Sequence, residues 1–314
     1  MSKSQIPTTL FSTLYPLSTN SVVIAGISGG PDSTALLVLL HQYVQKKNIR
    51  VIVAHVNHGI RGKAADRDEA FVHALAQKFN FDFESLRTNL SGSGIEEQGR
   101  EVRREFFLEL QKQYKADWIL TAHTADDHAE TILFRLLRGT GIGGLAGIGS
   151  QEGTFLRPLI NTTKKELLAF LKRNKQKFCT DATNTDESYT RNFIRKKMMP
   201  LCEKINPSYR DAFSRLSKIA EGTEEWIENE AALFIGKKVT KNQIPAHDLL
   251  QLALPLQAAV INRVYKEVAK THYHLPLEQL DRIRGMLVKN VGNKRVIYKK
   301  AQFHLRKGLL EISL

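Results

Sequence analysis

The residues best suited to chemistry in this chain of 314 amino acids begin with a short loop, residues 28–33. The loop, Ser-Gly-Gly-Pro-Asp-Ser, follows a run of β-branched apolar residues and precedes an apolar run of helical character. A strand, a glycine turn and a helix start aim backbone N–H groups at an anion, and glycines allow close approach. Asp32 adds a carboxylate at which Mg²⁺ can bridge to phosphate. Without the Gly-Lys-Ser/Thr ending of a Walker A loop, the segment predicts a different kind of phosphate site.

A second group of polar residues follows the strand predicted over residues 116–120. His123 lies at the end of this strand, and Asp126, Asp127 and Glu130 fall at the start of the next helix. Negative charge is favoured there by the helix dipole, so capping alone explains one acid. Two adjacent acids also suit magnesium binding, or general-base work on an attacking amine.

The strand predicted over residues 50–55 leads into a third group. In an open parallel sheet, ligands collect at the carboxyl ends of the strands. We therefore expect Ala54 and His55 to contact a nucleotide, and His58 and Arg61 to contact substrate. Each histidine taken alone is better explained as a turn or core residue that is bonded to backbone, and it is their clustering that favours substrate contact.

Three arginines mark the helix predicted over residues 95–107. Arg100 and Arg104 are four residues apart and share one face, with Arg103 beside them. A solvated helix face with Glu–Arg pairs explains this pattern. The alternative is that these arginines neutralise phosphate or adenylate charge, with Arg104 a catalytic candidate.

The net charge of +14 predicts a polyanionic partner, and nucleic acid is the commonest for a soluble protein. Between residues 161 and 215 there are 13 Lys/Arg and 6 Asp/Glu, an excess of +7, so the charge is not evenly spread. Apolar runs are too short to span a membrane, and the N-terminal residues show no export signal. The two cysteines, Cys179 and Cys202, form neither a Cys-x-x-Cys metal site nor a disulfide framework, so a reducing cytoplasm is expected.

The spacing of apolar runs predicts an α/β domain over residues 1–215, with an open parallel five-stranded sheet and helices on both faces. A smaller, mostly helical domain with short terminal strands is expected over residues 216–314. Thr162 or Thr163 can cap the helix that follows the last strand of the first domain. The remaining expectations concern single segments: a lead-in helix over 9–15, a last strand over 155–160, a packed glycine-rich loop over 139–149, long helices over 212–234, 249–268 and 277–287, and a terminal hairpin turning at 307–308.

Taken in order, these segments resemble the tRNA(Ile)-lysidine synthetase family, a branch of the PP-loop superfamily (N-type ATP pyrophosphatases) with an adenine nucleotide alpha hydrolase-like fold. The resemblance covers about residues 20–200. The loop 28–33 is common to the superfamily, and the segment 181–195, Asp-x-x-Asn followed by Tyr-x-Arg-Asn-x-Ile-Arg, is the most discriminating. The other matching segments are 55–61, 96–104, 121–131, 137–141 and 157–159.

The resemblance implies ATP-dependent attachment of free lysine to C2 of the wobble cytidine, position 34, of the isoleucine tRNA with the anticodon CAU. An adenylated tRNA would form first, with release of pyrophosphate, and the lysine amine would then displace AMP. The loop 28–33 and Mg²⁺, held by Asp32 and Asp127, would stabilise the departing pyrophosphate. Asp126 or Asp127 would position the amine or take its proton. Substrate contacts are implied for Arg100, Arg103, His123, Glu130, Arg191, Asn192 and Arg195, and the face from Asn192 to Lys197 would hold tRNA phosphates.

Other activities stay open at this point. A base thiolase of the same superfamily typically carries added Cys-x-x-Cys pairs, which are absent here. A small-molecule amidating synthetase is disfavoured by the basic 161–215 region, and a non-catalytic RNA-binding protein by the intact acids. Nothing in the sequence fixes the oligomeric state, for which a homodimer is one option, or the residues that bind free lysine.

Overall fold

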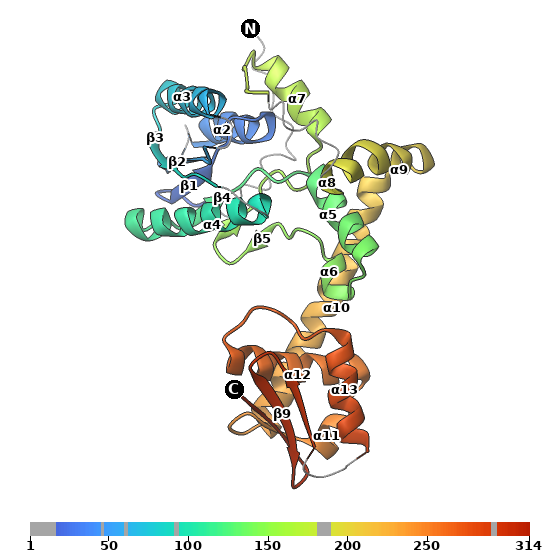
Figure 1. The fold of residues 1–314 in the computed structure, drawn as a ribbon. Helices are drawn as coiled ribbons and strands as arrows, with labels where there is room; N and C mark the ends of the chain where they lie inside the picture. The colour runs from blue at the N-terminus through green and yellow to red at the C-terminus, as the bar shows by residue number, and fades with distance from the viewer. Residues whose placement is uncertain (1–16, 45–46, 60–61, 91–93, 181–189, 290–293) are drawn as a thin grey trace. The chain divides into compact units, whose positions relative to one another are not determined.

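The computed structural model describes residues 17–44, 47–59, 62–90, 94–180, 190–289 and 294–314. The chain divides into two compact units, Met1–Ser217 and Lys218–Leu314, two residues beyond the boundary expected from the sequence (Figure 1). Three of the sequence predictions lie outside the described residues. They are the lead-in helix over residues 9–15, the residue Arg61, and residues 181–189 of the discriminating segment 181–195.

The first unit is built on a six-stranded sheet in the order β3-β2-β1-β4-β6-β5. Five strands are parallel, as predicted, and β5 adds a short antiparallel edge through its pairing with β6. The chain builds outward from β1 to β2 and β3, and then returns to place β4 on the other side of β1. The carboxyl ends of β1 and β4 therefore form the topological switch point. The strands are β1 (Val22–Gly26), β2 (Arg50–Asn57), β3 (Asp82–Arg87), β4 (Trp118–Leu120), β5 (Gln151–Glu152) and β6 (Phe155–Leu156).

Both faces of this sheet are buried, as a parallel sheet requires. Apolar residues of β1 and β2 alternate between two cores: Val23 and Val51 face one side, and Ile24 faces the other. Helices α2, α3 and α7 cover the first face, and α4 covers the second (Figure 1). The bounds are α2 (Pro31–Val44), α3 (Lys63–Lys78), α4 (Ile95–Tyr114), and α7 (Lys164–Arg173).

The last strand is shorter than predicted. β6 ends at Leu156, and the backbone N–H of Arg157 bonds to the carbonyl of Ser150. Pro158 has no N–H to donate to a ladder, and the chain then turns, with Thr162 N–H bonded to Leu159. The expected strand 155–160 therefore ends early, and its remaining residues form the turn that precedes α7.

The remaining helices of the first unit pack around α5 (Ala125–Arg138). Its buried side contacts the helices that follow residue 190, through Leu133 and Ile194. The expected packed loop after α5 contains a four-residue helix, and Arg135 holds it by donating to the carbonyls of Gly144 and Gly147. These elements are α6 (Ile142–Leu145), α8 (Thr190–Phe193), the π-helical segment η2 (Ile194–Met198) and α9 (Met199–Ile205). They are followed by α10 (Tyr209–Lys238), which begins in the first unit and continues past Ser217 into the second.

The second unit packs helices α11, α12 and α13 against an antiparallel sheet in the order β7-β10-β9-β8. The helices expected over 212–234, 249–268 and 277–287 correspond to α10, α12 and α13, and the terminal hairpin is confirmed. The short strand β7 was not expected. Pro255 lies in the first turn of α12, where its missing N–H costs no hydrogen bond, so the predicted helix is split there. The bounds are β7 (Gln243–Pro245), α11 (Ala246–Leu250), α12 (Leu254–Ala269), α13 (Leu277–Val288), β8 (Arg295–Tyr298), β9 (Ala301–Arg306) and β10 (Leu309–Ser313).

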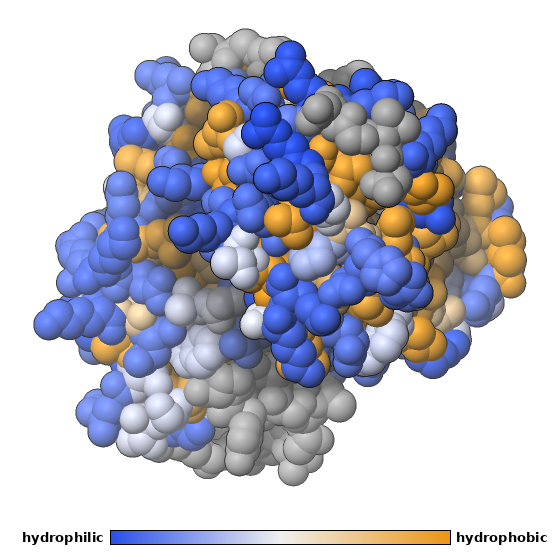
Figure 2. Space-filling model, turned by 90° about the horizontal axis from the view of Figure 1, so that it is seen from below, coloured by the Kyte–Doolittle hydropathy of each residue, from blue (hydrophilic) through white to orange (hydrophobic). Residues whose placement is uncertain are grey.

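The surface drawn in Figure 2 carries mostly hydrophilic side chains, with smaller apolar patches between them. In the described part of the chain, no helix combines the length and apolar character that crossing a membrane requires.

Candidate functional site

The loop between β1 and α2 is held in shape by its own serines. The hydroxyl of Ser33 accepts the backbone N–H groups of Ser28 and Gly29, each at 3.2 Å, and donates to the carbonyl of Gly30 at 3.1 Å. Gly29 has φ +91°, and a Cβ added to it would lie 3.4 Å from the sulfur of Cys179. Only glycine adopts this conformation without strain. The loop is therefore preformed at the carboxyl end of β1, with Pro31 opening the helix that follows.

Asp32 lies in the first turn of α2 and points into a partly buried site. Its Oδ1 atom is buried and has no hydrogen-bond partner in the described part of the chain. Its Oδ2 atom lies 3.9 Å from the ammonium of Lys164. Burial, opposed by Lys164 and reinforced by Asp127 and Asp126, raises the pKa of Asp32 to about 6.

Asp127 lies opposite, in the first turn of α5. It completes a capping box: its Oδ2 accepts the N–H of Thr124 at 2.9 Å, and the Thr124 hydroxyl accepts the Asp127 N–H. Its Oδ1 binds the ammonium of Lys164 at 3.0 Å. Burial opposes ionisation, but Lys164 and the bonds from Thr124 outweigh it and lower the pKa of Asp127. One acid thus both caps the helix and carries a stable negative charge.

Asp126 has a different environment although it is the next residue. Its Oδ2 accepts the backbone N–H of Lys164 at 2.7 Å, and its Oδ1 accepts Nε of Arg210 at 2.8 Å. These two bonds join α5 to the starts of α7 and α10. Both oxygens of Asp126 therefore hold the walls of the site together.

Glu130 forms a two-bond ion pair with Arg195, each N–O distance being 2.7 Å. Arg195 also lies 3.7 Å from Asp127. Its partners raise the pKa of the guanidinium, the bond to Glu130 contributing most. Together with Lys164, these groups form an alternating cluster of acids and cations beside the loop 28–33.

A cavity of about 130 Å³ opens beside this cluster. Charged side chains from α5, α7, η2 and α10 face it, together with Tyr209, whose buried hydroxyl has no partner among the described residues. Burial raises the pKa of Tyr209 to about 12, so the hydroxyl keeps its proton at neutral pH. The lining residues are Asp126, Glu130, Lys164, Arg195, Met199, Pro200, Glu203, Tyr209 and Arg210.

The predicted histidines are neutral at pH 7 for a common reason, which is burial. His123 bonds the Thr121 hydroxyl at 2.9 Å, and burial lowers its pKa to about 4. His55 bonds the carbonyl of Ile27 at 2.8 Å, and burial lowers its pKa also. The pKa of His58 is lowered by burial and then by Arg103, and its Nδ1 has no partner in the described part of the chain.

Ala54 lies in the hydrophobic core, and its carbonyl accepts the N–H of Ile27 at 2.9 Å. Its side chain is fully buried, that of the neighbouring His55 is buried too, and the nucleotide contact expected for both stays a prediction.

The three arginines of α4 divide between two places. Arg100 and Arg103 lie close enough to His123 for their charge to lower its pKa. Arg104 lies over the ring of Phe155 at 4.7 Å and pairs with Glu152 of β5 at 3.4 Å. The structure therefore brings two of the three toward the carboxyl end of β4, and Arg104 to the sheet edge.

The structure adds residues that the sequence analysis did not single out, above all Lys164. A lysine in the first turn of a helix lies next to the positive end of the helix dipole, which is unfavourable. This position was the one sign in the sequence that Lys164 has an acidic partner. Arg157 is a second addition: it donates to Glu152 at 2.7 Å and to the carbonyl of Gly149, and so ties the glycine-rich loop to the sheet edge.

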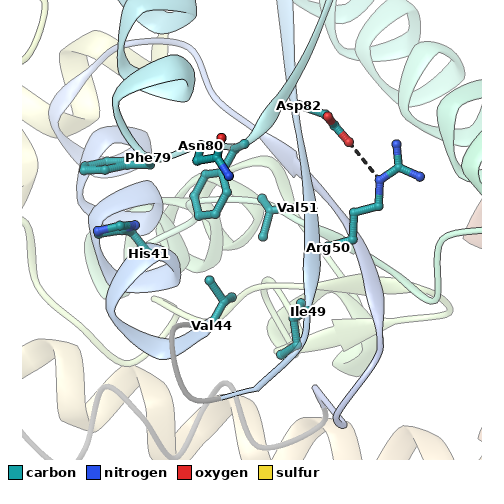
Figure 3. Close-up of a pocket in the computed structure, with 9 residues that line it drawn as sticks. His41, Val44, Ile49, Arg50, Val51, Phe79, Asn80 and Asp82 are labelled. Carbon is teal, nitrogen blue, oxygen red and sulfur yellow. Dashed lines mark hydrogen bonds and ion pairs between the residues drawn. The ribbon is translucent and has the colours of Figure 1, made fainter.

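A larger hollow of about 360 Å³ lies elsewhere, at the amino ends of β2 and β3 (Figure 3). His41 stacks on Phe79 at 4.3 Å there, and Arg50 pairs with Asp82 at 2.8 Å. None of the expected site residues lines it. In parallel sheets ligands bind at the opposite, carboxyl end, so the candidate site is the smaller, charged cavity.

Fold and site together define a phosphate-binding α/β domain whose acids and cations meet at the switch point of a parallel sheet. A family model described as a PP-loop domain matches residues 3–202. The solved U34-tRNA thiolase NcsA from Methanococcus maripaludis, with its [4Fe-4S] cluster, has a similar fold: TM-score 0.58, 20% identity, covering 68% of this chain and 77% of that one.

Two curated relatives are more similar in sequence, and both are tRNA(Ile)-lysidine synthases. That of Clostridium perfringens is 34% identical over 87% of this chain and 60% of its own length. That of Chlorobaculum tepidum is 32% identical over 88% of this chain and 86% of its own length. The chain belongs to the tRNA(Ile)-lysidine synthase family of PP-loop proteins. It spans about 60% of the length of the first of these relatives.

Proposed function

We propose that this protein uses ATP to ligate free lysine to C2 of the wobble cytidine of the isoleucine tRNA with the anticodon CAU. The observation that carries the proposal is the cluster of Asp32, Lys164, Asp127, Glu130 and Arg195 beside a preformed phosphate loop. The cluster brings together, in one site, acids that can receive an incoming amine and cations that can bind departing phosphates. Family membership points to the same reaction.

In the first step, the C2 oxygen of the cytidine attacks the α-phosphorus of ATP, and the bond to the β-phosphate breaks. The loop 28–33 and the start of α2 hold the departing pyrophosphate. The loop has no lysine of its own, and the ammonium of Lys164, 3.9 Å from Asp32, supplies that charge from α7. Arg103 and Arg100, which act electrostatically on His123, balance the adenylate phosphate.

Mg²⁺ fits this site on the chemistry of the side chains present. Asp32 carries a buried carboxylate oxygen without a partner in the described structure, and Asp127 offers a second carboxylate. No group of three or more His, Cys, Asp or Glu among the described residues can hold a metal ion alone. Mg²⁺ commonly takes one or two carboxylates and completes its shell with phosphates and water. When bound, it would stabilise charge on the phosphates.

In the second step, the lysine amine attacks C2 as a neutral nucleophile, the C2–O bond breaks, and AMP leaves. Asp127 draws the ammonium into place and accepts the proton that the amine loses. We assign this role to Asp127 because it faces the ammonium of Lys164, which also lies 3.9 Å from Asp32 at the phosphate loop. The oxygens of Asp126 instead bond the backbone N–H of Lys164 and the side chain of Arg210. Arg195 keeps Glu130 in position within the same site through its two bonds.

A base thiolase on the same fold is the principal alternative. Iron–sulfur clusters are held mainly by cysteine thiolates, up to four of them. Cys179 and Cys202 are the only cysteines of this chain, too few for such a site. This count favours ligation over thiolation.

The proposal is tested with labelled lysine, ATP and unmodified isoleucine tRNA, comparing the natural chain with Asp32→Ala and Asp127→Ala. Stable RNA-linked lysine, reduced at least roughly 100-fold in both variants, is expected, because each removes a charged group from the reacting centre. Asp211→Ala is the matched control, since Asp211 is exposed in the first turn of α10. Consumption of ATP without incorporation of lysine would overturn the assignment.

The substrates also suggest the setting. ATP, lysine and unmodified tRNA meet in the cytoplasm, and we place the protein there.

A further inference from the structure

The side of α5 beyond the acid cluster carries an aromatic ring between two arginines. The guanidinium carbon of Arg138 lies 5.1 Å from the ring centre of Phe134, and that of Arg191 lies 5.6 Å from it. Arg191 belongs to α8, which runs beside α5 (Figure 1). Phe134 is half-buried and packs against the core beneath α5, so the flat surfaces offered to a ligand are the guanidinium planes that its ring supports.

These residues continue the line of the candidate site. Glu130, Phe134 and Arg138 are spaced by four residues along one side of α5, and Glu130 pairs with Arg195 just as Phe134 pairs with Arg191. At 1.5 Å per residue, Arg138 lies about 12 Å from Glu130 along the helix. That span is enough for about two nucleotides of an extended strand leaving the site.

The surroundings are strongly cationic. Arg135 lies on the same helix, and burial first, then the charges of Arg191 and Arg100, lower its pKa. A group of cations this close together attracts a polyanion. The arrangement therefore favours a ligand that carries phosphates as well as flat rings.

We propose that Phe134, Arg138 and Arg191, the α5–α8 track, bind the single-stranded RNA next to the modified cytidine. The neighbouring base stacks on the guanidinium planes that the ring of Phe134 supports, and the arginine charges hold the adjoining phosphates. Aromatic and arginine surfaces bind unstacked bases in this way, largely without reading their identity. This inference rests on the proposed function, because it takes the cytidine to react beside Asp127.

The test uses the full chain and an anticodon stem-loop RNA in which 2-aminopurine replaces the adenine that follows the cytidine. Stacking quenches 2-aminopurine, so binding to the natural chain is expected to lower its fluorescence. Phe134→Leu keeps an apolar side chain but removes the ring, and it should lose the quenching and bind roughly 5- to 100-fold more weakly. Phe134→Tyr restores a ring and should restore both signals.

Two further variants guard the result. Leu136→Ala, at a residue 53% exposed on another side of α5, is the matched control and should behave as the natural chain. Arg191→Gln keeps the ring of Phe134 but removes a guanidinium that lies over it, and it should reduce the salt dependence of binding by about one phosphate contact.

Quenching and affinity within twofold of the natural chain in Phe134→Leu would overturn the track. An unchanged salt slope in Arg191→Gln would overturn it as well, even if Phe134→Leu proved unstable. Lysine incorporation by the natural chain is measured alongside. Its absence would contradict the proposed function, whereas the fluorescence arms report on the track alone.

Discussion

At the scale of single residues, the site shows how environment assigns different roles to similar groups. Asp126 and Asp127 are neighbours in sequence, yet Asp126 bonds a backbone N–H and Arg210 while Asp127 faces Lys164. Asp32 differs again: one of its carboxylate oxygens has no partner among the described residues, and its pKa is raised. Groups whose pKa values are driven apart in one site are typical of catalytic centres.

Asp32→Asn should stabilise the fold at neutral pH. The folded-state pKa of about 6 lies above the ordinary 3.8, so between these values the folded chain binds more protons than the unfolded chain. Ionised Asp32 therefore lowers stability as pH rises from about 4 to 6, and the penalty is complete above 6. We expect the variant to gain about 1–3 kcal/mol at pH 7.5 and much less at pH 4.

Denaturant unfolding at both pH values measures this difference. Asp211→Asn, at an exposed position, is the control and should show no such trend. A gain in Asp32→Asn that did not depend on pH would contradict the raised pKa.

Lys164→Met should lower the rate of pyrophosphate release by roughly 100-fold, the typical cost of removing one preorganised charge from a reacting centre. The reason is that its ammonium contacts Asp127 at 3.0 Å and lies 3.9 Å from Asp32. Lys165→Met is the control, because Lys165 is the next residue and is exposed. Equal rates in the two variants would remove Lys164 from the mechanism.

At the scale of elements, the start of α7 decides where Lys164 lies. Thr163 caps this helix in a reciprocal box with Glu166, as the sequence predicted for Thr162 or Thr163. The backbone N–H of Lys164 is fixed in turn by Asp126. Helix capping, which usually serves stability, here also positions a charged side chain.

Thr163→Ala should destabilise the protein by about 1 kcal/mol through loss of the cap. It should also lower activity more than this stability loss explains, because the first turn of α7 carries Lys164. Thr163→Ser keeps the capping oxygen and should retain both properties. Thermal unfolding and pyrophosphate release, measured on both variants, check the two parts separately; full activity in Thr163→Ala would contradict the link.

At the scale of the whole molecule, charge is distributed unevenly. The excess of +7 over residues 161–215 is half of the total of +14, and this segment includes Lys196 and Lys197. Both belong to η2, the element that also carries Arg195. A polyanion drawn to this region is therefore delivered close to the acid cluster.

Binding of tRNA should weaken steeply with salt, by roughly 10³-fold or more between 50 and 200 mM if about six phosphates are contacted. Replacing Lys196 and Lys197 by Gln should reduce the salt slope by about two. Lys63→Gln with Lys112→Gln, at exposed positions on α3 and α4, removes the same charge elsewhere and is the control. Equal slopes in the two double variants would show that the charge acts only at long range.

The sequence by itself determined the parallel sheet, its phosphate loop and most helices, because these depend on local patterns. Buried β-branched runs, turn glycines and capping residues act over a few neighbours, and the terminal hairpin at Lys307 and Gly308 followed from the same rules. The segment at Pro158 was one exception, since a partner for its backbone was needed to decide its length, and the short edge strands β5 and β7 were others.

Tertiary structure alone decided the roles within the site. Lys164 meets Asp127 across 37 residues, Arg195 meets Glu130 across 65, and Arg210 meets Asp126 across 84. No local periodicity records such pairings, because they arise when strands order themselves in the sheet and bring distant helix starts together. The same long-range packing placed Ala54 in the core and Arg104 at the sheet edge. It also buried Asp32 and His123, and this burial sets their pKa values.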